Sequence, residues 1–126
     1  MPSRFVRVGN DQLLEARYIV GGKSPDTYDY FWFGKTGATL VDFRPIVVAA
    51  NSVLQAGKRV LRLDYEADDP GTHGLWNYGN PLRSRLGVTN ENDRKWSGIV
   101  DVEFKIERGH VITTKASYDP DARIDE

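Results

Sequence analysis

Residues 99–116 read IVDVEFKIERGHVITTKA, and polar and apolar side chains alternate through the first half of this stretch. In an extended chain Val100, Val102, Phe104 and Ile106 share one face, and charged side chains occupy the other. An Arg-Gly-His tripeptide interrupts the alternation, and its glycine can adopt the positive φ angle of a tight turn. The residues after it are rich in β-branched side chains, which favour strands. The stretch therefore predicts a β-hairpin with one apolar face.

Further strands are expected on the N-terminal side of this hairpin, where short apolar or alternating segments are separated by glycines. In one of them, Leu14 and Ala16 share the face expected to point inward, while Glu15 and Arg17 point away. The expected strands cover residues 5–8, 14–20, 28–33, 39–43, 60–65, 99–107 and 111–116. This pattern predicts an all-β, single-domain fold with at most one short helix. It is typical of a β-sandwich, Ig-like or jelly-roll-like, or of a small barrel.

The segment 46–56 is ambiguous between helix and strand. It follows Pro45 and precedes Gly57, an arrangement typical of a helix. The pair Val47-Val48 favours a strand instead. We expect a strand followed by a loop, with a helix as the alternative.

Length and composition exclude several classes of protein. The chain has 126 residues with no cysteine and a net charge of −1. One domain of this size can bury a core without disulfides or metals. The absence of cysteine excludes thiolate zinc sites and cysteine nucleophiles. The near-neutral charge argues against a nucleic-acid partner.

No apolar run approaches the length of a membrane span or of a signal-peptide core. We expect a soluble protein, cytoplasmic or within an assembled particle, with no membrane partner.

Two stretches depart from the strand pattern, and charge is distributed unevenly. Residues 77–95 are expected to form a long loop, and residues 117–126 an acidic C-terminal tail. Residues 1–63 hold nine basic and five acidic side chains, whereas residues 64–126 hold eight and thirteen. Chance variation in a short chain is the favoured explanation of this difference; the alternative is that oppositely charged surfaces meet head to tail between copies.

The aromatic residues supply the strongest indication of a binding surface. In residues 28–33, Tyr28, Tyr30 and Trp32 share one face, and Phe31 and Phe33 share the other. Such a strand is either central in a sandwich or covered by a partner on its outer face. Elsewhere Trp, Tyr and Arg are interleaved with Asn and Gly, the mixture found at protein-binding hot spots. The candidate partner-binding residues are Trp76, Tyr78, Arg83, Arg85, Arg94, Trp96, Asp119 and Asp121.

Two other kinds of site are weaker alternatives. Asp64, Glu66 and Asp68 would project from one face of an extended chain, where Ca²⁺ could bind, although solvated carboxylates are the favoured interpretation. His73 lies near Asp68 and Asp69 and could act as a general base, although no nucleophile motif accompanies it. We expect no catalytic residues and no cofactor other than this candidate Ca²⁺.

The sequence therefore favours a non-enzymatic structural protein that self-assembles or docks on another protein. A virion shell, tube or decoration component is the concrete instance. A carbohydrate-binding module, assisted by Ca²⁺ at Asp64, Glu66 and Asp68, is the first alternative, because aromatic side chains also stack on sugar rings. A small barrel enzyme that uses His73 and a carboxylate is the second.

Overall fold

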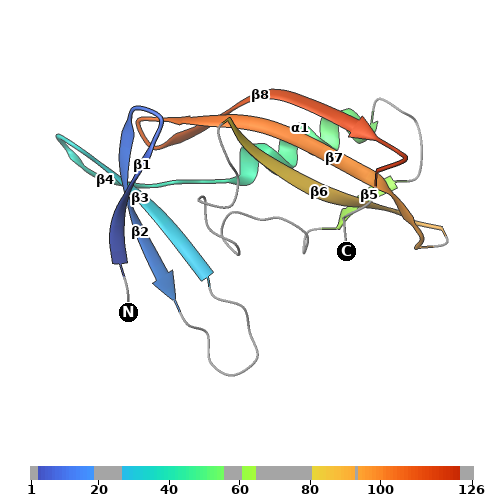
Figure 1. The fold of residues 1–126 in the computed structure, drawn as a ribbon, viewed down its shortest axis with the longest axis horizontal. Coiled ribbons are helices and arrows are strands. Elements are labelled where there is room, and N and C mark those ends of the chain that lie inside the picture. Colours follow the sequence, from blue (N-terminus) through green and yellow to red (C-terminus); the bar gives the residue numbers. More distant parts are fainter. Residues whose placement is uncertain (1–2, 19–26, 56–60, 65–80, 93, 123–126) are drawn as a thin grey trace.

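The computed structural model describes residues 3–18, 27–55, 61–64, 81–92 and 94–122, and they form two antiparallel sheets and a helix (Figure 1). The four strands of each sheet are paired in sequence order. Sheet A contains β1 (Ser3–Val8), β2 (Asp11–Tyr18), β3 (Thr27–Gly34) and β4 (Gly37–Leu40). Sheet B contains β5 (Leu61–Asp64), β6 (Leu82–Asn90), β7 (Trp96–Glu107) and β8 (His110–Asp119). The helix α1 (Arg44–Gln55) lies between the two sheets in the chain.

This architecture confirms the prediction of an all-β, sandwich-like fold with a single short helix. Neither sheet closes into a barrel within the part of the chain that the structure describes. The predicted hairpin is formed by β7 and β8, with Glu107 opposite His110 across the turn. Val100, Val102, Phe104 and Ile106 are all buried, as the alternation predicts. Among the described residues, no helix has the length and apolar character needed to cross a membrane.

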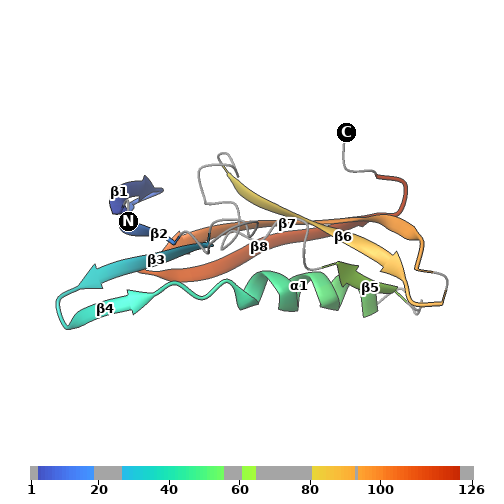
Figure 2. The same ribbon diagram turned by 90° about the horizontal axis from the view of Figure 1, so that it is seen from below.

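The expectation of a strand in the segment 46–56 is wrong, because residues 46–55 belong to α1. Ile46, Ala50 and Leu54 recur every four residues and are buried, whereas Val48 is 64% exposed. A strand would place Ile46, Val48 and Ala50 on one face. The residues that pack into the core instead have the spacing of one helix face. Figure 2 shows α1 running along one side of sheet B, where it contacts β5, β7 and β8.

The expectation of a long loop at residues 77–95 is also wrong, because β6 occupies Leu82–Asn90. Ser84, Leu86 and Val88 are buried, whereas Arg83 and Arg85, which flank Ser84, are exposed. Buried and exposed residues therefore do alternate in β6. The alternation is hard to recognise in the sequence, because the buried residues include a serine and Gly87. The expected acidic tail begins later than residue 117, because Ser117 to Asp119 are paired with β7.

The orientation predicted for the second strand is reversed. Leu13 and Glu15 are buried, while Leu14 and Ala16 are only half-buried on the opposite face. The inward position of Glu15 is possible because Tyr30, also fully buried, donates a hydrogen bond to its carboxylate. Burial of a charged group that is hydrogen-bonded avoids the full desolvation cost.

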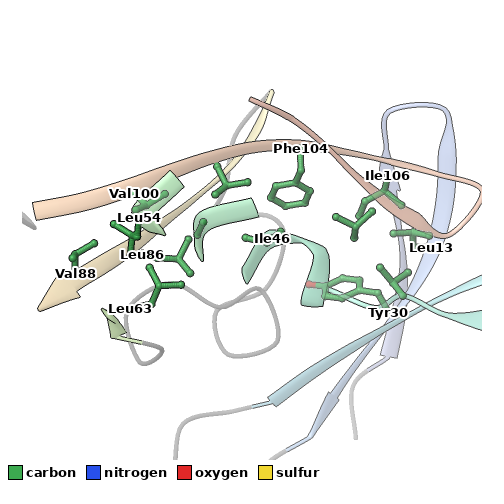
Figure 3. Close-up of a cluster of buried hydrophobic side chains, with 14 residues drawn as sticks. Leu13, Tyr30, Ile46, Leu54, Leu63, Leu86, Val88, Val100, Phe104 and Ile106 are labelled. Atoms are coloured by element: carbon green, nitrogen blue, oxygen red, sulfur yellow. The ribbon is translucent and has the colours of Figure 1, made fainter. Parts of the chain in front are cut away.

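One hydrophobic core joins both sheets and the helix (Figure 3). Leu13 and Tyr30 come from sheet A, Ile46 from the start of α1, and Phe104 and Ile106 from β7. Tyr30 also packs edge-on against Phe43, with ring centroids 6.0 Å apart. The inner face of sheet A is therefore covered by the β7–β8 hairpin and the start of the helix.

Candidate functional site

The outer face of sheet A carries a row of large apolar side chains that crosses all four strands. Phe5 pairs with Leu14, Leu14 with Phe31, and Phe31 with Leu40 in the strand register. Phe5 is 60% exposed and Leu40 55%, whereas Leu14 and Phe31 between them are half-buried. Phe33 lies two residues beyond Phe31 on the same face and is 53% exposed. Contiguous apolar side chains at the surface are typical of contact sites.

Basic side chains lie at the border of this row. Arg7 is exposed and lies on the same face of β1 as Phe5, two residues away. Lys35 is exposed in the turn that follows Phe33. Asp29 is half-buried and shares the outer face with Phe31. We use the term outer patch for Phe5, Leu14, Phe31, Phe33 and Leu40 together with Arg7 and Lys35.

The inner face of sheet A holds a buried carboxylate that is fully engaged in the fold. Glu15 Oε2 accepts a hydrogen bond of 2.6 Å from the Tyr30 hydroxyl, and Oε1 accepts one of 2.9 Å from Arg4 Nε. The Glu15 side chain is 5% exposed, whereas that of Arg4 is 62% exposed. The three residues lie side by side on β2, β3 and β1, so the network fixes the register of these strands.

The β7–β8 turn fits against sheet A, and the contact joins the two sheets. The backbone N–H of Gly109 donates a 3.1 Å hydrogen bond to the buried Asp11 carboxylate. The Arg108 guanidinium lies 5.7 Å from the centre of the Trp32 ring, a cation–π distance. Gly109 has a φ angle of +82°, and a Cβ atom there would lie 2.8 Å from Cβ of Trp32.

An open hollow of about 320 Å³ lies beside this joint, between the β1–β2 turn and residues 105–108. Lys105 and Glu107 in its wall form a 2.8 Å ion pair. Asp11 and Arg108 in the same wall are the residues that hold the two sheets together. Its charged side chains therefore already take part in contacts of the fold, and we interpret the hollow as part of the joint.

The outer face of sheet B differs from that of sheet A because its charged side chains pair with one another. Arg83 Nη2 lies 2.6 Å from Asp101 Oδ2, and hydrogen bonding to this carboxylate raises the pKa of Arg83. The Glu103 carboxylate accepts a 2.9 Å hydrogen bond from the Thr114 hydroxyl. Arg85 is exposed opposite Asp101 in the register. Such a ladder of opposite charges is typical of a solvated sheet face.

Three of the predicted partner-binding residues come together at the far end of sheet B. Trp96 is half-buried, and its indole N–H donates a 2.8 Å hydrogen bond to the carbonyl of Ala122. This bond brings the segment containing Asp119 and Asp121 next to the start of β7. The Tyr118 hydroxyl donates to the carbonyl of Ser97 and strengthens the same contact.

Among the other predicted partner-binding residues, the structure describes Arg83, Arg85 and Arg94. Arg83 and Arg85 are on the charged outer face of sheet B. Arg94 is exposed in the β6–β7 turn, with a φ angle of +58°, and its backbone N–H donates to the carbonyl of Asn90. Trp76 and Tyr78 lie outside the described residues.

The alternative sites fall mainly outside the described residues. Glu66, Asp68, Asp69 and His73 are not among them, and of Asp64 the structure gives only its position at the end of β5. Across the residues that are described, no group of three or more His, Cys, Asp or Glu side chains is arranged to hold a metal ion.

Sequence reasoning indicated two of the five apolar residues of the outer patch. The two-faced aromatic pattern of residues 28–33 pointed to Phe31 and Phe33. Leu14 was expected to point inward, and Phe5 and Leu40 were not singled out. Only the register of four strands places them in one row.

Comparison with protein-family models, with curated proteins and with solved structures found no significant match to this chain.

Proposed function

We propose that the protein is a non-enzymatic interaction protein that associates with further copies of itself through the outer patch of sheet A. A specific example of such a protein is a shell, tube or decoration component of a virion, which is built from many subunits. The observation that supports this proposal is the row Phe5, Leu14, Phe31 and Leu40 on the outer face of sheet A, with its two ends more than half exposed.

These side chains gain free energy when a partner removes their apolar area from water. Apolar area removed from water contributes roughly 25 cal/mol per Å². Phe5, Phe33 and Leu40 are each more than half exposed in the single chain, so this contribution is available only on association. The apolar centre with basic side chains at its border also matches the composition of protein interfaces.

The buried acids support a structural role over a catalytic one. Asp11 and Glu15 are the two buried carboxylates among the described residues. Asp11 accepts a hydrogen bond from Gly109, and Glu15 accepts hydrogen bonds from Tyr30 and Arg4. Both carboxylates therefore hold strands and turns in place.

The test is a variant that makes the outer patch polar: Phe5→Ser, Phe33→Ser and Leu40→Ser in one chain. We expect the apparent mass of the natural protein to rise with concentration in size-exclusion chromatography with light scattering. The triple variant should stay at 14.2 kDa over the same range. Because the three side chains are exposed, its circular dichroism spectrum should match that of the natural protein.

Val48→Ser is the matched control, because Val48 is 64% exposed but lies on α1 and outside the outer patch. This variant should associate as the natural protein does. A natural protein that stays monomeric at every concentration would contradict the proposal, as would a triple variant that associates normally.

A further inference from the structure

The outer face of sheet A carries cations on one side of its apolar residues. We use the term apolar row for the four residues that pair from strand to strand across this face, Phe5, Leu14, Phe31 and Leu40. Arg7 follows the row in β1, and Lys35 follows it in the turn after β3. Strands β1 and β3 run in the same direction, because β2 is antiparallel to both. Arg7 and Lys35 therefore lie on the same side of the row, and both are exposed.

A carboxylate lies on the opposite side of the apolar row. Asp29 precedes the row in β3 and pairs with Ala16, which pairs in turn with Ser3. Asp29 is therefore the charged side chain on this side of the outer face, and it is half-buried. The other charged residues of the four strands alternate with these positions and belong to the inner face; they are Arg4, Asp11, Glu15 and Arg17.

The three charged side chains of the outer face are available to a partner. Within the described part of the chain, the side chains of Arg7, Lys35 and Asp29 form no hydrogen bond or ion pair. Sheet A lies at one end of the long axis of the molecule (Figure 1). Its inner face packs against the β7–β8 hairpin and the start of α1, so its outer face points away from them. An apolar sheet face commonly packs on another sheet about 10 Å away, with the strands aligned to within about 30°.

We infer that two copies pack with their outer patches face to face, related by a two-fold axis that runs along the apolar row. The inference rests on the proposed function and specifies how the copies are oriented. Rotation about the row exchanges its two sides, so Asp29 of each copy faces the side of the other copy that carries Arg7 and Lys35. The same contact occurs twice, because the two copies are equivalent. The apolar row of one copy meets that of the other between the two charge contacts.

The other two-fold arrangement of the same faces is disfavoured by charge. If the axis ran parallel to the strands, the side that carries Arg7 and Lys35 would meet the same side of the other copy. Asp29 would then lie nearest to Asp29 of that copy. Opposite charges fix the orientation of a contact, and like charges that face each other exclude the wrong one. The distribution of the three charges therefore selects the axis along the row.

The size of the face sets the expected strength of the contact. Strands about 4.8 Å apart, with a rise of about 3.4 Å per residue, give four strands of about six residues an area of roughly 400 Å². Contact between two such faces buries less than about 1,200 Å² in total, which is the range of weak and transient complexes. We therefore expect a dimer that forms at high protein concentration and dissociates on dilution. Such dimers would be the building units of any larger assembly.

The test exchanges the charges of Lys35 and Asp29. Lys35→Glu places a carboxylate opposite Asp29 of the other copy, and Asp29→Lys places lysines opposite each other. Each variant alone should therefore dimerise more than about tenfold more weakly than the natural protein in sedimentation velocity. An equimolar mixture of the two variants should form a dimer with one chain of each, because both contacts then join opposite charges. A chain that carries both substitutions should dimerise with itself for the same reason.

Two control variants carry the same changes of charge away from sheet A. Lys115 lies on the outer face of sheet B, opposite Glu103, and Glu91 lies in the β6–β7 turn; both are exposed. Lys115→Glu and Glu91→Lys should each dimerise as the natural protein does. These controls separate a contact made by Lys35 and Asp29 from an effect of net charge.

Other outcomes distinguish failure of this inference from failure of the proposed function. Single variants of Lys35 and Asp29 that dimerise as the natural protein does would overturn the axis along the row. A mixture that stays monomeric, when each variant alone is monomeric, would overturn it as well. Both results leave the proposed function standing if the variant with three serines remains monomeric while the natural protein associates. A natural protein that never associates would overturn both.

Discussion

Glu15 illustrates how one buried charge can hold several strands in place. Its two carboxylate oxygens are bound separately, one by the Tyr30 hydroxyl and the other by Arg4. Hydrogen bonds to a charged group are stronger than those between neutral groups. The Tyr30 bond lies entirely in the interior, whereas the Arg4 side chain reaches solvent. Tyr30 is therefore the partner whose loss should matter more.

The first prediction concerns Tyr30→Phe, which removes the hydroxyl and leaves the ring in the core. Loss of the hydrogen bond to a buried carboxylate should lower the free energy of unfolding by about 1–3 kcal/mol. Urea unfolding measures this difference. The control is Tyr28→Phe, on the same face of β3 but half-buried, which should change stability by less than about 0.5 kcal/mol. Equal effects of the two substitutions would show that the Glu15 network contributes little.

Asp42 acts at the start of α1. Its carboxylate accepts a 3.0 Å hydrogen bond from the backbone N–H of Arg44, as a helix cap does, and also binds the Arg44 guanidinium at 2.7 Å. Hydrogen bonding to the Arg44 side chain, and then to its backbone N–H, lowers the pKa of Asp42. The unfolded chain lacks these bonds, so the pKa there is higher.

The second prediction is a pH dependence. Because the pKa of Asp42 is lower in the folded chain, its contribution to stability is present above the unfolded-state value of about 3.9. That contribution is lost as the pH falls through the folded-state value. Asp42→Asn keeps a capping side chain but does not titrate. Urea unfolding at about pH 6 and about pH 3 should show a larger loss of stability for the natural protein than for Asp42→Asn. Parallel losses would contradict the prediction.

At the scale of the elements, the β7–β8 turn is closely enclosed by sheet A. Its tip touches Trp32 and Thr39 of sheet A, and its backbone is bound by Asp11. Gly109 meets two requirements at once, a positive φ angle and the absence of a side chain. Gly9, in the β1–β2 turn, meets only the first, because a Cβ atom there would have nothing within 4 Å.

The third prediction compares Gly109→Ala with Gly9→Ala. Both substitutions place a side chain at positive φ, which costs about 1–2 kcal/mol. Gly109→Ala also forces Cβ against Trp32, and overpacking of this kind costs about 1–3 kcal/mol more. The difference in unfolding free energy between the two variants therefore measures how tightly the turn fits sheet A. A difference near zero would mean that the turn moves away at no cost.

An element could be predicted from the sequence where the spacing of its apolar residues matched the spacing of its buried positions. The β7–β8 hairpin was predicted because Val100, Val102, Phe104 and Ile106 alternate with charged residues in β7. The helix α1 was missed because Val47-Val48 suggested a strand, although Ile46, Ala50 and Leu54 have the helical spacing. The strand β6 was missed because Ser84 and Gly87 lie among its buried residues. In both cases contacts with the rest of the fold outweighed the local preference.

The candidate site was predictable to a smaller extent, because it depends on strand register. Phe31 and Phe33 could be found from one strand alone. Phe5 and Leu40 belong to the patch only because β1 and β4 lie at the two edges of sheet A, which no local pattern reveals. Trp96 was predicted as a binding residue, and the structure also gives it an internal role as the donor to Ala122.

At the scale of the whole molecule, the two sheets share one core. Leu13 and Tyr30 of sheet A belong to the same buried cluster as Ile106 and Val111 of sheet B. The Asp11–Gly109 hydrogen bond and the Arg108–Trp32 contact reinforce this connection. Neither sheet covers its own inner face, so the stability of each depends on the other.

The fourth prediction is that both sheets unfold together. Slowly exchanging amides of β2 and of β7 should report the same free energy of opening in hydrogen exchange. Ile106→Ala, which removes a buried side chain at their junction, should lower both values alike, by about 2–5 kcal/mol. Faster exchange throughout β2 than in β7 would show that sheet A opens independently.

The joint between the sheets also has a consequence for the order of events during synthesis. The strands of sheet A are complete once residue 40 has left the ribosome, but the turn that binds Asp11 contains residue 109. At about 5–20 residues per second, roughly 3–14 seconds of translation separate the two. During that interval the strands of sheet A lack their inner covering and the hydrogen bond to Asp11, while the apolar side chains of the outer patch have already left the ribosome. Newly made chains on one polysome are therefore most exposed to premature pairing or chaperone capture at this stage, before the last hairpin emerges.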